Sequence, residues 1–153
     1  MPEEPLPDAA CEPTNGWPSL LRLEGDAAPV LLGSRCSRCT YTAFPAMTVC
    51  PRCLDGDSMQ AVELSREGTL ENFTTVHQAP RGFKAPYIQA FVRLPEGPLV
   101  FTHIADADPL APGLAVGDKM VLTTGLICSN PAGRALIGYK FRPSRTSKGA
   151  DGA

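Results

Sequence analysis

The chain has 153 residues, of which 43% are hydrophobic and 20% are charged, and its formal net charge is −2. This length suits one domain or two small subdomains, and the near-neutral charge gives no electrostatic basis for binding duplex nucleic acid. No apolar run approaches the roughly 20 residues that cross a bilayer, and the acidic, Pro-rich start resembles neither a secretory signal nor a transit peptide. We therefore expect a cytoplasmic protein that makes no membrane contact.

The first 33 residues are predicted to form an arm and a short helix. Residues 1–16 are rich in acidic side chains and proline, so an ordered fold there would need a partner. The segment Trp17-Pro-Ser-Leu-Leu-Arg-Leu then places Pro in the first turn of a helix, which Gly25 would end. Four apolar side chains would cluster on this helix: Trp17, Leu20, Leu21 and Leu23.

Residues 34–58 contain four of the six cysteines, arranged as two C-x-x-C pairs with ten residues between them. Each tight turn presents two thiolates on one side, and four thiolates at tetrahedral corners suit Zn²⁺. Four protein ligands leave no open position for water, so a structural role is favoured over a catalytic one. We predict a structural Zn²⁺ site in this ribbon, formed by Cys36, Cys39, Cys50 and Cys53. An iron centre would use the same ligands.

Two other interpretations of the cysteines are weaker. Three disulfides would suit a secreted domain, but nothing here indicates secretion, and cytosolic thiols stay reduced. A single C-x-x-C is also typical of a redox pair, whereas two pairs together favour a metal. Arg35, Arg38 and Arg52 are expected to lower the pKa of the thiols. The segment between the pairs, residues 40–49, is predicted to form a short hairpin.

Residues 59–143 are predicted to form a five-stranded OB-type barrel, followed by a flexible tail over residues 144–153. Short alternating segments separated by turns indicate strands, and a longer Pro- and Gly-rich connection divides the third strand from the fourth. A break in the alternation at Glu71-Asn72 predicts a bulge. The expected strands cover residues 70–76, 88–94, 99–104, 118–128 and 135–141.

The sequence contains no recognisable catalytic set. His77 and His103 have no candidate nucleophile near them in the sequence. The motifs of α/β-hydrolases, dinucleotide-binding folds, P-loops and zinc proteases are also absent. These observations favour a binding or assembly module.

Eight short stretches then carry a family resemblance through their order: Arg35-Cys-Ser-Arg-Cys39, Phe44-Pro45, Val49-Cys-Pro-Arg-Cys53, Gly68-Thr-Leu, Phe73-Thr-Thr-Val-His77, Pro86-Tyr87, Leu94-Pro-Glu-Gly97 and Gly138-Tyr-Lys-Phe-Arg-Pro143. The chain resembles the zinc-ribbon/OB-fold acyl-CoA-associated proteins, once grouped as a domain of unknown function, over about residues 17–143. The resemblance implies a mainly β protein with a short N-terminal helix, a rubredoxin-like zinc ribbon and an OB barrel.

The resemblance also implies a partner role. Members of this family form complexes with thiolase-fold enzymes, which include thiolases, related synthases and aldolases that cleave steroid side chains. The thiolase-fold subunit carries the catalytic groups. This chain would be the non-catalytic zinc subunit of a complex that cleaves a 3-oxoacyl-CoA with CoA. The complex would contain two copies of this chain and two copies of its partner. One such setting is the degradation of aromatic compounds.

The chain departs from the family pattern at two positions. The family often has Gly after the second cysteine, where a left-handed turn is needed, and this chain has Thr40. We therefore expect a strained or differently shaped turn there. The family also often has a basic residue near the position of Met47, so a phosphate contact at that point is not expected.

The first loop of the predicted barrel, residues 78–86, is the remaining candidate site. It combines Arg81 and Lys84 with Phe83, a set suited to the phosphates and adenine ring of CoA or to a partner surface; an ordinary solvated loop is the alternative. The competing function is single-stranded nucleic-acid binding, because zinc ribbons and OB folds both occur in such proteins. A pI of about 5.6 and 7% aromatic residues argue against it.

Overall fold

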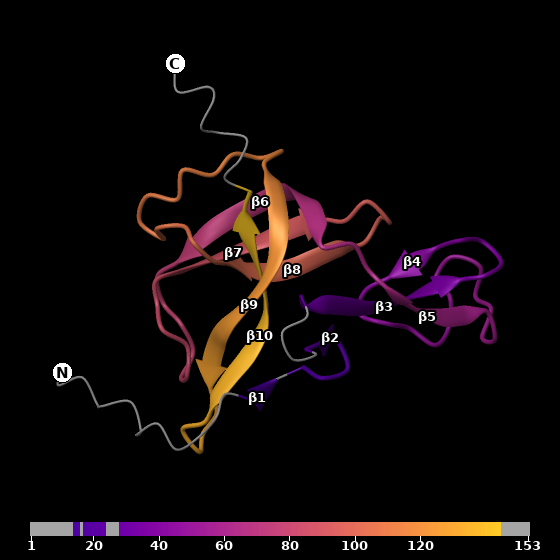
Figure 1. Cartoon of the computed structure of the whole chain (residues 1–153), viewed down its shortest axis with the longest axis horizontal. Helices are drawn as coiled ribbons and strands as arrows, with labels where there is room; N and C mark the ends of the chain where they lie inside the picture. Colours follow the sequence, from indigo (N-terminus) through magenta and orange to yellow (C-terminus); the bar gives the residue numbers. More distant parts are fainter. Residues whose placement is uncertain (1–13, 16, 24–27, 145–153) are drawn as a thin grey trace.

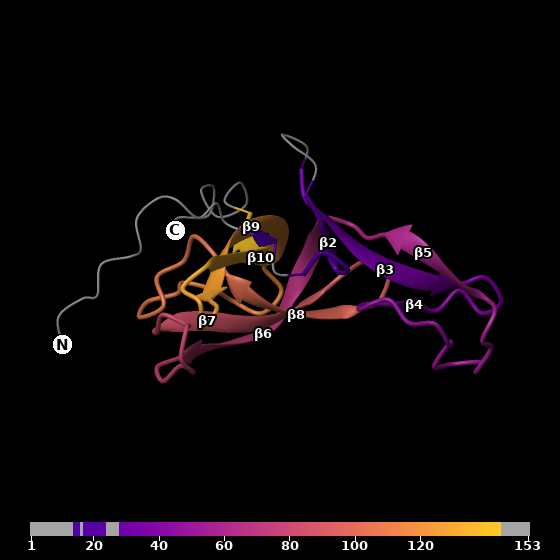
Figure 2. The same ribbon diagram turned by 90° about the horizontal axis from the view of Figure 1, so that it is seen from below.

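A computed structural model describes residues 14–15, 17–23 and 28–144 of the chain. Within those ranges all of the regular secondary structure is β, and it forms a barrel and a smaller sheet (Figure 1). The view turned by 90° shows the smaller sheet extending away from one side of the barrel (Figure 2). No helix in the described ranges is long and apolar enough to span a bilayer.

Five strands close the barrel in the order β6–β7–β8–β10–β9, and β9 pairs back with β6. β8 and β10 run parallel, and the other neighbours in the barrel run antiparallel. This connectivity confirms the predicted five-stranded OB-type barrel. The strands are β6 (Glu67–Val76), β7 (Tyr87–Arg93), β8 (Leu99–Ile104), β9 (Lys119–Ser129) and β10 (Ala135–Pro143).

The sequence pattern accounts for the local shape of these strands. The register between β6 and β7 shifts between Leu70 and Asn72, so Glu71 is the extra residue of the predicted bulge. In β7 every second side chain points into the barrel, and Ile88, Ala90 and Val92 are buried. The alternate side chains of β7 and β8 therefore lie on the outer face of the barrel.

The barrel and the smaller sheet share one hydrophobic core. Leu21, Leu31 and Leu64 come from outside the barrel strands and pack in the same cluster as barrel residues such as Leu70 and Phe141. Each of these leucines is buried, which contributes about 1.5–3 kcal/mol per side chain. This shared core fixes the cysteine-bearing sheet against the barrel.

The smaller sheet is organised around β3 (Val30–Cys36), which pairs antiparallel with β2 (Leu21–Arg22), β4 (Thr42–Ala43) and β5 (Met59–Glu63). We call residues 30–63 the cysteine ribbon. Within the predicted hairpin over residues 40–49, only Thr42 and Ala43 form a strand, and they pair with Arg35 and Ser34 of β3. The hairpin is therefore formed by β3 and β4 across the first cysteine pair.

The predicted N-terminal helix is wrong for the described residues. Trp17 to Leu20 form a single turn, in which the carbonyl of Trp17 accepts hydrogen bonds from the N–H groups of Leu20 (3.0 Å) and Leu21 (2.9 Å). The chain then enters β2 because pairing with β3 buries Leu21 completely, which outweighs helix propensity. Gly25 lies outside the described residues, as do most of the predicted arm and tail. Thr14 and Asn15 form β1, parallel to β10.

Candidate functional site

The four ribbon cysteines converge at the end of the cysteine ribbon. Cys36 ends β3, Cys39 follows in the turn before β4, and Cys50 and Cys53 lie in the loop before β5. All four Sγ atoms lie within 4.8 Å of one another. The Sγ atoms of Cys36 and Cys53 are 3.6 Å apart, and those of Cys39 and Cys50 are 3.5 Å apart. Tetrahedral Zn–S bonds of about 2.3 Å imply sulfur separations of about 3.8 Å, so the cluster fits this ion.

The two cysteine turns share one backbone geometry. The N–H of Thr40 donates to the carbonyl of Cys36 at 2.9 Å, and the N–H of Leu54 donates to the carbonyl of Cys50 at 2.8 Å. Thr40 and Leu54 both adopt left-handed backbone, with φ of 66° and 61°. Strain at Thr40 is therefore confirmed, but the shape of its turn matches that of the second turn. Each of the two turns therefore directs its two sulfur atoms toward the same cluster.

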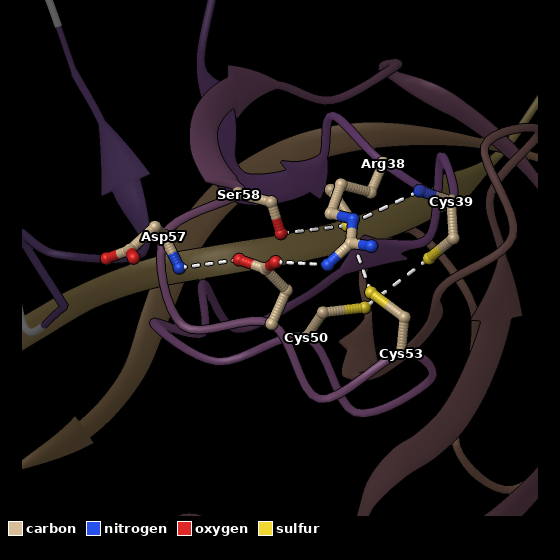
Figure 3. A network of polar contacts seen from close by, with 8 residues as sticks. Arg38, Cys39, Cys50, Cys53, Asp57 and Ser58 are labelled. Atoms are coloured by element: carbon tan, nitrogen blue, oxygen red, sulfur yellow. Dashed lines mark hydrogen bonds and ion pairs between the residues drawn. The ribbon is translucent and has the colours of Figure 1, made fainter.

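The polar surroundings distinguish the sulfur atoms from one another (Figure 3). The Ser58 hydroxyl lies 3.1 Å from the Cys36 sulfur, and their hydrogen bond is the main reason that the pKa of Cys36 falls to about 6. The N–H of Asp55 lowers the pKa of Cys53, but burial and the neighbouring sulfur atoms outweigh it and raise the pKa to about 11. Four adjacent thiols cannot all ionise without a compensating cation, which is what a metal supplies.

Two of the ribbon arginines, Arg38 and Arg52, have partners other than the sulfur atoms. Arg38 forms an ion pair with Asp55 at 2.6 Å, and its charge interacts more weakly with Cys53. Asp55 also accepts the N–H of Asp57 at 2.8 Å, which orders the loop before β5. The Arg52 guanidinium lies 5.3 Å from the centre of the Tyr41 ring. Hydrogen bonds and burial, and not the arginine charges, are the main causes that shift the pKa of the four thiols.

The loop predicted to contact CoA lies between β6 and β7, and its three candidate residues separate in space. Phe83 lines a hollow of about 270 Å³ on the outer face of β7 and β8. Lys84 lines a neighbouring hollow of about 490 Å³. Arg81 is exposed and lines neither of these two hollows.

Several rings that the sequence does not mark as site residues pack together in the structure. The His103 ring stacks on Tyr87, with ring centres 4.6 Å apart. Trp17 and Phe44, which are distant in sequence, both pack on Tyr139, with ring centres 5.2 Å and 5.6 Å away. Strand alternation would place Tyr87 and His103 on the outer face, but only the folded chain shows that Trp17 joins them.

Comparisons with known proteins give this architecture a family. The family model of the ChsH2 C-terminal OB-fold domain matches residues 61–125. The chain is 37% identical over 127 residues to the benzoylsuccinyl-CoA thiolase subunit BbsA of Thauera aromatica, across 82% of this chain and 85% of that protein. It is 31% identical over 116 residues to a DUF35 domain-containing scaffold protein of Methanocaldococcus jannaschii, across 74% of this chain and 81% of that protein. The chain belongs to the DUF35 family.

A solved structure agrees with this membership. The Ltp2-ChsH2(DUF35) aldolase matches this DUF35 chain with a TM-score of 0.58 and 28% identity, over 74% of this chain and 84% of the matched chain. The expected resemblance to the zinc-ribbon/OB-fold acyl-CoA-associated proteins is thereby confirmed.

Proposed function

We propose that this DUF35 chain is the non-catalytic, metal-binding subunit of a heteromeric thiolase-type complex that cleaves a 3-oxoacyl-CoA with CoA. The observation that carries the proposal is its 37% identity to a thiolase subunit over 82% of the chain. The site geometry agrees, because the four clustered cysteines are arranged as mutual neighbours around one point and suit a metal better than a nucleophile. A thiolase-fold partner would then supply the reacting groups.

The function of the relative suggests a setting for the complex. BbsA is a subunit of benzoylsuccinyl-CoA thiolase, so an aromatic 3-oxoacyl-CoA is our candidate substrate class and cytoplasmic degradation of aromatic compounds our candidate pathway class. A two-plus-two assembly of this chain with its partner is part of the same proposal.

Zn²⁺ is the metal we propose for the cysteine ribbon, with Cys36, Cys39, Cys50 and Cys53 as its ligands. Bound there, Zn²⁺ would act as a cross-link that joins the end of β3 to the loop before β5. Four thiolate ligands leave no position for substrate, so the metal would hold the ribbon in shape. Metal analysis of the purified chain is expected to give one zinc per chain, whereas iron would overturn the assignment of the metal.

The CoA contact proposed from the sequence keeps two supporting observations. Phe83 and Lys84 line adjoining hollows on one face, and Arg81 is exposed beside them. Replacing Arg81 and Lys84 together by Ala is expected to weaken CoA binding by the assembled complex. Unchanged assembly and unchanged CoA affinity would contradict this contact.

Affinity capture from the native source tests the main proposal. A tagged copy of the chain is expected to retain a thiolase-fold protein, identified by mass spectrometry. Recovery of the chain alone, under conditions that preserve other native complexes, would contradict it.

Single-stranded nucleic-acid binding remains the alternative function. One observation favours it: aromatic side chains of β7 and β8 lie on the face through which OB folds bind oligonucleotides. The formal charge of −2 opposes it. Salt-sensitive micromolar binding to single-stranded oligonucleotides at low salt would support the alternative.

A further inference from the structure

Aromatic side chains from separate parts of the chain surround the 270 Å³ hollow on the outer face of β7 and β8. The rings of Tyr87 and His103 stack with their centres 4.6 Å apart, and the Phe83 ring centre lies 6.0 Å from that of Tyr87 and 6.1 Å from that of His103. Two further rings of the lining, Trp17 and Tyr139, pack together with ring centres 5.2 Å apart. Because a cavity of about 150 Å³ holds a benzene molecule, this hollow has room for one ring or two fused rings.

The second hollow adjoins the first and differs from it in chemistry. Tyr87, His103 and Ile127 line both hollows, and Lys84 and Lys140 line only the second. Asp106 also lines it, so the two ammonium groups and one carboxylate leave a net charge of +1 there. The second hollow is therefore expected to attract anionic groups.

The electrostatics of Lys140 support this reading of the second hollow. Burial lowers the pKa of Lys140, and the nearby Asp106 carboxylate opposes that effect. The ammonium group is half-buried, so an anion beside it would be less screened than on an open surface. Burial, and secondarily Lys140, also lower the pKa of His103, which keeps its imidazole neutral and suited to stacking.

The loop that carries Phe83 and Lys84 is held in place by its backbone. The N–H of Ser129 donates to the carbonyl of Gly82 at 2.9 Å, and the N–H of Phe83 donates to the carbonyl of Pro80 at 3.1 Å. Gly82 has φ of 95°, and a side chain at that position would collide with the carbonyl oxygen of Ser129. The two hollows are therefore largely formed before any ligand arrives, as ligand sites usually are.

We propose that this face binds a planar aromatic ring that carries an anionic group, with the ring in the first hollow and the anion beside Lys84 and Lys140 in the second. A nucleotide and an aryl carboxylate share this chemistry. The inference shares Phe83 and Lys84 with the proposed CoA contact, but it does not rest on the thiolase-type partner. Ligand binding by the chain alone and capture of a partner can therefore fail independently.

Trp17 provides the readout, because it lines the aromatic hollow and is the only tryptophan of the chain. The full-length, metal-loaded chain is titrated with adenosine 3′,5′-bisphosphate and with benzoate while Trp17 fluorescence is recorded. Adenosine and benzamide are the matched neutral probes, and inorganic phosphate is the anion without a ring. We expect saturable quenching by at least one charged probe. Its affinity should exceed that of its neutral counterpart about tenfold or more, and a tenfold difference in affinity corresponds to about 1.4 kcal/mol of binding free energy. Tighter binding of the bisphosphate identifies a nucleotide, and tighter binding of benzoate identifies an aryl carboxylate.

Two substitutions locate the site. Phe83→Ala is expected to weaken binding of the probe about tenfold. Phe73→Ala is the matched control, because Phe73 is partly buried, as Phe83 is, and lines neither hollow. Lys140→Met is expected to remove the advantage of the charged probe over the neutral one, and Lys119→Met, at an exposed position of β9, is its control. If Phe83→Ala proves unfolded by circular dichroism, Lys140→Met still decides the result.

Three results would overturn the inference. The first is no quenching by any ring probe, and the second is equal affinity for charged and neutral probes. The third is quenching that Phe83→Ala and Lys140→Met leave unchanged, which would place the ligand elsewhere.

Discussion

The left-handed backbone that follows each cysteine pair can be tested by substitution with glycine. Leu54 has φ of 61° and its side chain is 76% exposed. A left-handed conformation costs an L-residue about 1–2 kcal/mol, and glycine escapes that cost. Glycine also makes the unfolded chain more flexible, which lowers stability by roughly 0.5–1 kcal/mol. Leu54→Gly is therefore expected to raise the free energy of unfolding by about 0.5–1 kcal/mol.

Leu110 offers a matched control. Its side chain is 73% exposed, so the two leucines lose similar burial on substitution, but Leu110 is not among the left-handed residues. Leu110→Gly is expected to lower the free energy of unfolding by roughly 0.5–1 kcal/mol. The two variants should then differ by about 1–2 kcal/mol, or about 2–8 °C in Tm for a domain of this size. Thermal unfolding of the metal-loaded proteins, followed by circular dichroism, measures the difference. Equal destabilisation by both substitutions would refute the reasoning from φ.

Three further predictions follow from other parts of the structure. Cys50→Ser is expected to abolish stoichiometric metal binding and lower Tm, whereas Cys128→Ser, outside the cluster, should leave the metal content unchanged; metal analysis and thermal unfolding report both. Gly138→Ala should destabilise the fold by about 1–3 kcal/mol and change Trp17 fluorescence, because the new methyl group collides with the Trp17 ring and comes within 2.7 Å of Ile127. Gly125→Ala is its milder control, since the nearest atom is a Lys140 methylene carbon at 3.3 Å, and equal effects of the two would contradict this packing. Burial and Lys140 hold the pKa of His103 below its usual 6.5, so the unfolded state binds more protons at this residue as the pH drops through about 6.5. The free energy of unfolding is therefore expected to fall in that range. Urea unfolding between pH 5 and 8 should show a smaller fall for His103→Gln than for the unsubstituted chain.

The barrel and the cysteine cluster were predictable because local patterns determine both. Alternation in β7 and the break at Glu71 reflect which side chains enter the core, and the folded chain has the same pattern. C-x-x-C spacing likewise places two sulfur atoms on one turn, whatever surrounds it. The resemblance to a known family added the order of the parts.

Features that depend on distant contacts were not predictable in the same way. The segment from Trp17 to Leu23 has a helical apolar pattern, yet pairing of Leu21 with Leu31 draws it into a sheet. The aromatic hollow needs Trp17 and Tyr139 from opposite ends of the described chain to meet. The sequence predicts one contact set of Arg81, Phe83 and Lys84, but the alternation of β7 and β8 gives no sign that Phe83 and Lys84 line different hollows.

The most direct test of the central proposal is to measure CoA-dependent cleavage by the captured complex with and without this chain. In native mass spectrometry the 16.2 kDa chain is expected to be detected in one complex with a thiolase-fold subunit. The partner alone is expected to lose most of its thiolytic activity and to regain it when the chain is added back. A partner that cleaves its 3-oxoacyl-CoA equally well in the absence of this chain, or a chain that remains a free monomer, would contradict the proposed role.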